Sequence, residues 1–282
     1  MATLPKLSEK FQKMNDNFKT WEEAVLWLRS QETHQELVKS AFYDDPLIDA
    51  VKRYADSCEW RAVEGLLPDT KGCALDVGAG RGISSYALIK SGWQVTALEP
   101  DPSHLVGAGA IRSLNDLEDL NIKIVETWGE TLPFEDSSFD LVFCRAVLHH
   151  ANDLKAFCME VNRVLKPEGV FLAIREHVIS RKEDLPSFLE SHPLHHLYGG
   201  EHAYLLHEYQ KAMSQGELKL CKTINPLASD INTFPQSLDE IKKHLAAKLY
   251  LPACMIPQWL LRLKGAMSHT PGRLYSFMAV KV

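Results

Sequence analysis

The 282-residue chain carries 31 Lys and Arg against 37 Asp and Glu, which gives a formal net charge of −6. This balance disfavours bulk nucleic-acid binding, because nucleic-acid binders present a basic surface to the phosphates. Hydrophobic residues make up 45% of the chain and charged residues 24%, which excludes a disordered chain as the default and predicts a sizeable core. The length fits one large domain or a core with an inserted subdomain.

The sequence contains no apolar run long enough to span a bilayer, and its first 13 residues are polar and charged, unlike a secretory signal. Its six cysteines are scattered without a C-x-x-C pair, which indicates reduced thiols rather than a disulfide framework or a zinc site. We therefore expect a cytoplasmic protein without a membrane span. The sequence leaves the oligomeric state open.

Residues 1–67 are predicted to be helical throughout. Apolar side chains recur at helical spacing from Phe18 to Leu28 and again from Leu47 to Ala55. The segment Leu67-Pro68-Asp69 then ends the last of these helices and leads into a strand. We expect an N-terminal helical cover, which either lies over a ligand site or simply packs on the sheet.

A buried strand breaks sharply into a helix between residues 73 and 90. The apolar run 73–75 reaches Asp76, and glycines then follow at alternate positions: Gly78, Gly80 and Gly82. Glycines let the backbone turn tightly and let a ligand approach closely. In a dinucleotide-binding G-x-G-x-x-G turn the third glycine comes one residue later. Asp76 would also repel a pyrophosphate, so the turn suits a ligand with positive charge.

Asp76-x-Gly78-x-Gly80-x-Gly82 resembles the first motif of the class I S-adenosylmethionine-dependent methyltransferases, whose ligand has an ammonium and a sulfonium group. A second signature, L-P-F at residues 132–134 and S-F-D-L-V at 138–142, resembles that of the small-molecule methyltransferases called type 11. The L-K-P-E-G run at 165–169 is similar to their L-K-P-G-G turn, with Glu168 replacing a glycine. The resemblance extends from residue 72 to residue 177.

Strand and helix patterns alternate from Gly72 onward, which predicts βαβ units and a parallel sheet. With the resemblance, they imply an α/β fold: a Rossmann-like, seven-stranded, mostly parallel sheet with helices on both faces and an antiparallel last strand. We expect four regions: an N-terminal cover at 1–67, a core with the cofactor site at 68–180, a helical lid or acceptor region at 181–270 that includes a candidate sixth strand at 218–223, and a final core strand at 271–282. Earlier strands are predicted at 93–98, 121–126, 139–143 and 170–174, and a helix is predicted at 102–114.

The resemblance implies S-adenosylmethionine as the cofactor. Glu99 ends the second predicted strand, where a carboxylate can accept both ribose hydroxyls. Where the family binds adenine with Asp or Asn, this chain has Trp128, which can stack on the adenine while the backbone near Gly129 or the Glu130 side chain forms hydrogen bonds. The residues expected to bind the cofactor are Asp76, Gly78, Ala79, Gly80, Gly82, Glu99, Pro100, Trp128, Gly129, Glu130, Arg145 and Ala146.

Three histidines are candidate general bases, because imidazole titrates near neutral pH. His149 and His150 follow the fourth predicted strand, and His177 follows the fifth, so all three face the predicted cleft. A structural role in capping the next helix is the alternative for the pair. A base is needed only for a weakly acidic acceptor such as a hydroxyl.

The segment 180–216 concentrates further histidines: His192, His195, His196, His202 and His207. Their spacing matches no recognised metal motif such as H-E-x-x-H. The sequence therefore predicts no metal site here, and it favours a mobile lid that shapes the acceptor pocket, with a hinge at residues 198–200.

The function expected from these features is transfer of a methyl group from S-adenosylmethionine to an O or N atom of a small-molecule acceptor, by in-line displacement. Two alternatives stay open. One is a methyltransferase-like protein that binds the cofactor without turnover, and the other is an NAD-dependent oxidoreductase.

Overall fold

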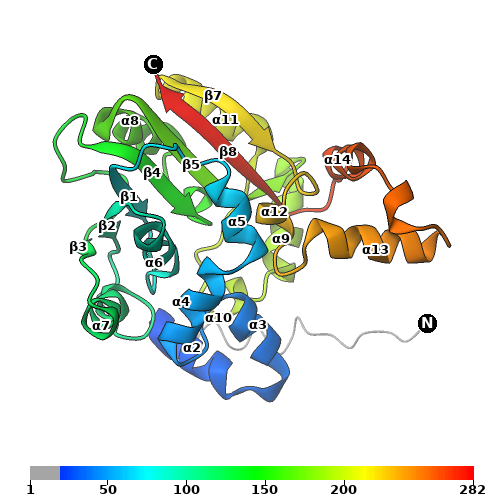
Figure 1. Ribbon diagram of the computed structural model, residues 1–282, viewed down its shortest axis with the longest axis horizontal. Helices are drawn as coiled ribbons and strands as arrows, with labels where there is room; N and C mark the ends of the chain where they lie inside the picture. The colour runs from blue at the N-terminus through cyan, green and yellow to red at the C-terminus, as the bar shows by residue number, and fades with distance from the viewer. Residues whose placement is uncertain (1–19) are drawn as a thin grey trace.

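The computed structural model describes residues 20–282, so the part of the predicted N-terminal cover before residue 20 lies outside the described residues. Its centre is a sheet with the order β3-β2-β1-β4-β5-β8-β7, and β6 pairs with β5 beside this path (Figure 1). The strands are β1 (Cys73–Val77), β2 (Gln94–Leu98), β3 (Lys123–Val125), β4 (Phe139–Arg145), β5 (Leu165–Ile179), β6 (Tyr204–Leu205), β7 (Leu218–Ile224) and β8 (Arg273–Lys281).

The sheet is mostly parallel. Strand β8 alone among the described strands is antiparallel, and it lies between β5 and β7. The central strands are mostly apolar because both faces of the sheet are covered. In register, Leu75 of β1 lies opposite Val142 of β4, and Phe143 of β4 lies opposite Leu172 of β5. The predicted Rossmann-like architecture is confirmed.

Helices cover both faces of this sheet. A hydrophobic cluster lies on each face, between the sheet and its helices. On one face, α8 (Leu154–Val164) and α11 (Leu206–Gln215) pack against side chains such as Phe171 and Phe277. The other face is covered by α4 (Leu47–Ala55), α5 (Cys58–Glu64), α6 (Ile83–Lys90), α7 (Ala108–Glu118) and α12 (Asp230–Thr233). Phe171 and Leu172 are neighbours in β5 and serve opposite clusters, as strand alternation requires.

Two further layers surround the carboxyl ends of the parallel strands. The N-terminal cover contains α2 (Trp21–Ser30), the 3₁₀ turn η1 (Glu32–His34) and α3 (Gln35–Ser40). The lid region contains η3 (Lys182–Asp184), α9 (Leu185–Ser191) and α10 (His195–Tyr198). The Trp21 ring of α2 lies 5.8 Å from the Tyr198 ring of α10, so the cover and the lid meet.

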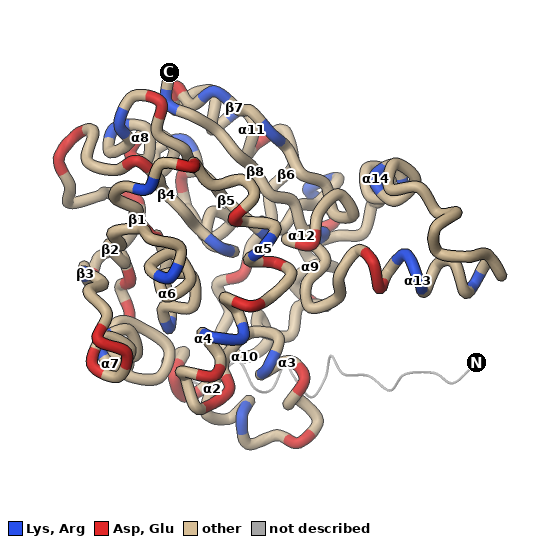
Figure 2. The backbone as a smooth tube through the Cα atoms, in the orientation of Figure 1, with Lys and Arg blue, Asp and Glu red and all other residues tan. Residues whose placement is uncertain are grey.

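Helices α13 (Leu238–Lys248) and α14 (Gln258–Ala266), with η4 (Ala253–Met255) between them, extend away from the sheet in Figure 1. Lys and Arg are interspersed with Asp and Glu along the described chain rather than gathered on one element (Figure 2). Within residues 20–282, no helix combines the length and the apolar character that crossing a membrane requires.

Three boundaries differ from the sequence-based expectation. Strand β5 begins at Leu165 and continues through Arg175-Glu176-His177, which were expected after the strand; a register shift against β8 between Ala173 and Glu176 lets the pairing resume. The two-residue β6 raises the strand number from seven to eight. Helix α7 begins at Ala108, later than the expected helix at 102–114.

Candidate active site

The glycine turn joins β1 to α6 at the carboxyl end of the sheet. Gly78, Gly80 and Gly82 have φ angles of 65°, 53° and 83°, a region that favours glycine. A Cβ on Gly78 would lie 2.6 Å from the Val147 side chain, so this glycine also permits close packing. The Gly78 and Ala79 N–H groups donate to the Leu98 carbonyl, which fixes the turn beside β2.

Asp76 lies beneath the turn and is 1% exposed. Its Oδ2 accepts hydrogen bonds from the Ser84 and Ser85 hydroxyls, at 2.8 and 2.6 Å. Burial raises the pKa of Asp76 to about 6, against the opposing effect of these serine hydrogen bonds. Oδ1 is buried and has no hydrogen-bond partner, so Asp76 retains one unsatisfied acceptor beside the turn.

Glu99, directly after β2, binds the backbone of the glycine turn. Its Oε2 accepts from the Gly80 N–H at 2.7 Å, and its Oε1 accepts from the Asp101 N–H at 3.0 Å. Burial raises the pKa of Glu99, and these two backbone hydrogen bonds oppose the rise. Each carboxylate oxygen keeps acceptor capacity, so Glu99 can accept hydroxyl donors without releasing the turn. Pro100 follows it directly and is half-buried.

The segment after β3 brings Gly129 to the end of β1. A Cβ on Gly129 would lie 3.0 Å from both Val77 and Phe157, so this backbone packs tightly against the sheet. Glu130 accepts from the Asn152 N–H at 2.7 Å. The Trp128 side chain is 76% exposed, so any stacking on a ligand would take place at the surface.

Arg145 ends β4, and its guanidinium points to α5 rather than to the glycine turn. It donates to both carboxylate oxygens of Glu59, at 2.6 and 3.0 Å, and Glu59 is fully buried. Arg175 lies 3.5 Å from the same carboxylate. Ala146 has a φ angle of 56°, and its N–H donates to the Ile174 carbonyl, so Ala146 marks the turn that leads out of β4.

The N-terminal cover is attached to the glycine turn by Arg81, which is 4% exposed. Its NH1 donates to the carbonyls of Phe42 and Asp44, at 2.8 and 2.9 Å, and its NH2 pairs with Asp45 at 2.7 Å. The Ser103 hydroxyl of the loop after β2 also bonds to Glu22 of α2. The cover therefore lies over the carboxyl ends of β1 and β2.

His149 lies in the 3₁₀ turn η2 (Leu148–His150) between two carboxylates and is 1% exposed. Its Nδ1 is 2.7 Å from Glu176 Oε2, and its Nε2 is 3.4 Å from Glu201 Oε2. Burial alone would lower its pKa, but the hydrogen bonds to Glu176 and Glu201 outweigh burial and raise the pKa to about 9. The backbone N–H groups of Val147, Leu148 and His149 also donate to Glu176.

The other two candidate bases lie beside His149. The His177 ring is 4.7 Å from the His149 ring, and the His150 ring is 4.2 Å from it. Burial and the charge of His149 lower the pKa of His177 to about 3 and also lower the pKa of the exposed His150. The structure thus brings together the three histidines that the sequence places after different strands.

Three carboxylates of this region were not predicted as site residues: Glu59 and Glu176 are buried, and Glu201 is partly buried. Glu176 accepts hydrogen bonds from the backbone N–H groups of residues 147–149. Glu59 pairs with two arginines, and Glu201 of the lid lies 3.4 Å from His149. Glu176 could have been recognised from the sequence, because it follows an apolar run in a strand. An ionised carboxylate that is buried there needs hydrogen-bond donors. Nothing in the local spacing pointed to Glu201, because its partner is far away in the sequence.

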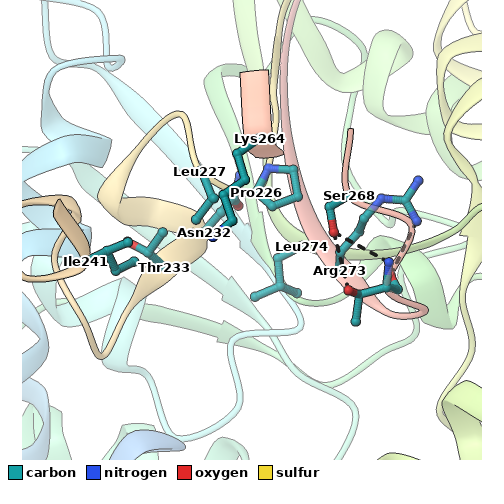
Figure 3. A pocket seen from close by; sticks show the side chains of 10 residues that line it. Pro226, Leu227, Asn232, Thr233, Ile241, Lys264, Ser268, Arg273 and Leu274 are labelled. Carbon is teal, nitrogen blue, oxygen red and sulfur yellow. Dashed lines mark hydrogen bonds between the residues drawn. The ribbon is translucent and has the colours of Figure 1, made fainter. Parts of the chain in front are cut away.

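A surface hollow lies elsewhere, near α12 and the start of β8 (Figure 3). Its lining includes Pro226, Asn232, Lys264, Ser268 and Leu274. None of the predicted site residues contributes to it, so the candidate active site remains the region between the glycine turn and the histidines.

The comparison with known proteins agrees with this arrangement. Residues 75–173 match a family model, Methyltransf_11, that describes a methyltransferase domain. The chain is 31% identical over 115 residues to YcgJ, an uncharacterized methyltransferase of Bacillus subtilis, covering 39% of this chain and 45% of that protein. It is 35% identical over 108 residues to a sterol 24-C-methyltransferase of Gibberella zeae, covering 38% of this chain and 28% of that protein.

The chain spans less than half the length of these curated relatives. Among solved structures, the geranyl diphosphate C-methyltransferase of Streptomyces coelicolor, in complex with Mg²⁺, geranyl diphosphate and S-adenosyl-L-homocysteine, is similar with a TM-score of 0.59 and 14% identity. That similarity covers 99% of each chain and concerns the fold, from the N-terminal cover to the last strand.

Proposed function

We propose that this protein is an S-adenosylmethionine-dependent methyltransferase that acts on an O or N atom of a small-molecule acceptor. One observation carries the proposal: the glycine turn, Asp76 and Glu99 meet at the carboxyl ends of β1 and β2, within a methyltransferase domain. Ligands of open α/β sheets bind at this edge of the sheet.

The residues present fit this cofactor. The turn can approach a ligand closely at Gly80, which has no side chain, and the nearest atom to the position that a Cβ would take is 3.8 Å away. Glu99 offers free acceptor capacity for ribose hydroxyls, and the unpartnered Oδ1 of Asp76 adds negative potential suited to a cationic ligand. We assign Gly129 and Glu130 to the adenine end of the cofactor site, and Ala146 to its methionine end.

When bound, the cofactor supplies a sulfonium methyl group for in-line displacement. The protein then contributes chiefly by holding the acceptor in line and by excluding water. The cover and the lid, which meet at Trp21 and Tyr198, serve to exclude water. Where the acceptor must lose a proton, His150 is the better candidate to accept it, because its imidazole is neutral while His149 is protonated. His177 is also neutral, but its pKa of about 3 makes it a weak base.

A carbon acceptor is the second candidate. The structure from Streptomyces coelicolor and the relative from Gibberella zeae are both C-methyltransferases. Carbon methylation would also use a proton acceptor, so the assignment of His150 and His177 is the same for both candidates.

The test is calorimetric titration of the purified protein with S-adenosylmethionine. We expect Glu99→Ala and Asp76→Ala to weaken binding at least about tenfold, since each removes a hydrogen-bonded or charged contact of about 1.5–3 kcal/mol. Asp116→Ala, at an exposed position of α7, is the matched control and should bind like the unmodified protein.

Absence of binding by the unmodified protein would contradict the proposal, and the same titration with NAD would then test the oxidoreductase alternative. Binding without formation of S-adenosylhomocysteine with any acceptor would instead support the alternative of a cofactor-binding protein without turnover.

A further inference from the structure

A cluster of metal-ligating side chains lies beside the proposed transfer site. His149, His177 and Glu201 each offer a ligand atom, and these atoms lie within 4.8 Å of one another. The three residues come from η2, β5 and the lid, so the fold assembles the cluster from distant segments. Two imidazoles and one carboxylate form a ligand set that proteins use for zinc and for non-haem iron.

Both imidazoles are oriented as metal ligands are. His149 Nδ1 is 2.7 Å from the Glu176 carboxylate, and His177 Nδ1 is 2.9 Å from the Gly272 carbonyl. These acceptors hold a proton on Nδ1 of each ring, and Nε2 of His149 becomes a ligand when the metal ion displaces its second proton. Metal-bound histidines almost always make such a hydrogen bond through the second nitrogen.

The spacing also suits a metal ion. His149 Nε2 lies 3.4 Å from Glu201 Oε2. Two ligands at about 2.0–2.1 Å from a tetrahedral zinc ion stand roughly 3.3 Å apart, so this pair needs almost no adjustment. The His192 ring is 5.0 Å from the His177 ring, and His192 Nδ1 is 3.9 Å from Glu201 Oε1. The His150 ring is 4.2 Å from the His149 ring, so two further imidazoles lie beside the cluster.

We propose that His149, His177 and Glu201 bind a divalent transition metal ion, with Zn²⁺ as the representative of the class. Mg²⁺ and Ca²⁺ are disfavoured because both prefer oxygen ligands, and imidazole supplies two of the three ligands here. Three protein ligands leave a further coordination position, as in catalytic rather than structural zinc sites.

The metal would connect the lid to the sheet. Glu201 is the ligand from the lid, and it follows Gly199 and Gly200, whose φ angles are 87° and 78°. His149 and His177 belong to the rigid end of the sheet, since Glu176 anchors η2 and β8 pairs with β5. The ion would therefore hold the segment around Glu201 against the carboxyl ends of β4 and β5.

This inference does not rest on methyl transfer, because metal content and spectrum report on it directly. The full-length protein is freed of metal with a chelator and titrated with Co²⁺, whose visible absorption reports coordination, and with Zn²⁺ by calorimetry. We expect one ion per chain, and we expect saturating Zn²⁺ to raise the melting temperature because the ion binds the folded state.

Glu201→Gln is the decisive variant, because Glu201 is only partly buried and its replacement is nearly isosteric. It should weaken Zn²⁺ binding at least tenfold and reduce the rise in melting temperature at a given Zn²⁺ concentration, and His177→Gln should do the same. His207→Ala removes an exposed histidine of the same region and should bind like the unmodified protein. Circular dichroism confirms that each variant is folded.

The proposal is overturned if the unmodified protein binds no stoichiometric Zn²⁺ or Co²⁺. His149 would then be a protonated imidazolium shared by Glu176 and Glu201. It is also overturned if Glu201→Gln binds as tightly as the unmodified protein, or if His207→Ala loses binding to the same extent, because the ions would then occupy surface histidines.

Discussion

Glu59 shows how much one residue contributes to the interior of this protein. Its carboxylate is fully buried and is shared by the guanidinium groups of Arg145 and Arg175. Burial tends to lower the pKa of Arg145, but the charge and hydrogen bonds of Glu59 outweigh burial and raise that pKa above its ordinary value. Glu59 thus links α5 to the ends of β4 and β5.

We predict that Glu59→Ala lowers the free energy of unfolding by about 3–5 kcal/mol, because it leaves two cations without their partner in a buried site. Urea denaturation measures this loss. Asp116→Ala, which removes an exposed carboxylate, should change the stability by less than about 0.5 kcal/mol. A loss below about 1 kcal/mol for Glu59→Ala would mean that water enters the site and solvates both arginines.

Asp76 should make the stability depend on pH. Its pKa rises from 3.8 to about 6 on folding, so the folded state holds the proton more tightly than the unfolded state. The contribution of Asp76 to stability is therefore greatest below pH 3.8, is lost as the pH rises through 6, and then stays constant. The shift corresponds to a cost of about 3 kcal/mol above pH 6.

Asp76→Asn removes this titration. We expect the stability of the variant relative to the unmodified protein to increase between pH 4 and pH 7, as measured by urea denaturation at several pH values. Glu168→Gln is the control, because Glu168 is exposed and carries a similar negative charge. A relative stability of Asp76→Asn that does not change with pH would show that the carboxyl group is solvated in the folded protein.

At the scale of single elements, the glycine turn depends on the packing between Gly78 and Val147. A Cβ at residue 78 would lie 2.6 Å from Val147 Cγ2, and φ is 65° there. Gly78→Ala should therefore lower the stability by at least about 1 kcal/mol and weaken cofactor binding, because both the steric conflict and the backbone strain must be relieved.

The double variant Gly78→Ala/Val147→Ala separates these two causes. It removes the conflicting methyl groups and leaves the φ strain, so we expect its cofactor affinity, measured by calorimetry, to recover in part. Val147→Ala alone supplies the baseline. If the double variant binds no better than Gly78→Ala, then the backbone angle rather than the packing limits the turn.

The elements that the sequence predicted well are those with a strong local pattern. The apolar runs of β1, β2 and β4 and the glycine turn into α6 need no distant information, and Asp153 caps α8 by accepting from the Ala156 N–H. The extension of β5 was not predictable in this way, because residues 175–177 are polar and remain in the strand only through pairing with β8. Strand β6 likewise exists only through its contact with β5.

The candidate site shows the same difference between residues predicted from local spacing and residues brought together by distant contacts. The glycines and Glu99 were predicted because their spacing along the chain is the signal, and the structure places them together at one turn. The contact between His149 and Glu201 was not predicted, since it depends on how the lid folds back onto η2. Arg145 donates to the fully buried Glu59 of α5. This partner was not predicted, because α5 lies far upstream in the sequence.

At the scale of the whole molecule, Arg81 couples the N-terminal cover to the cofactor turn. It binds the 42–45 segment through three hydrogen bonds and belongs to the glycine turn itself. Cofactor binding and closure of the cover should therefore favour each other, because both restrict the same residues. Arg81→Met keeps the apolar part of the side chain and removes these hydrogen bonds together with the ion pair to Asp45.

We predict that Arg81→Met weakens S-adenosylmethionine binding several-fold and speeds amide hydrogen exchange in residues 38–45, while exchange in β1 and β4 stays slow. The selective effect follows because Arg81 attaches the cover, whereas the two strands are held by the sheet and its core clusters. Lys52→Met, in α4 on the same face and half exposed, should change neither quantity, since its contact with Glu118 is a surface ion pair. Faster exchange throughout β1 and β4 in Arg81→Met would instead show that Arg81 supports the core, and cofactor binding would then not report on the cover.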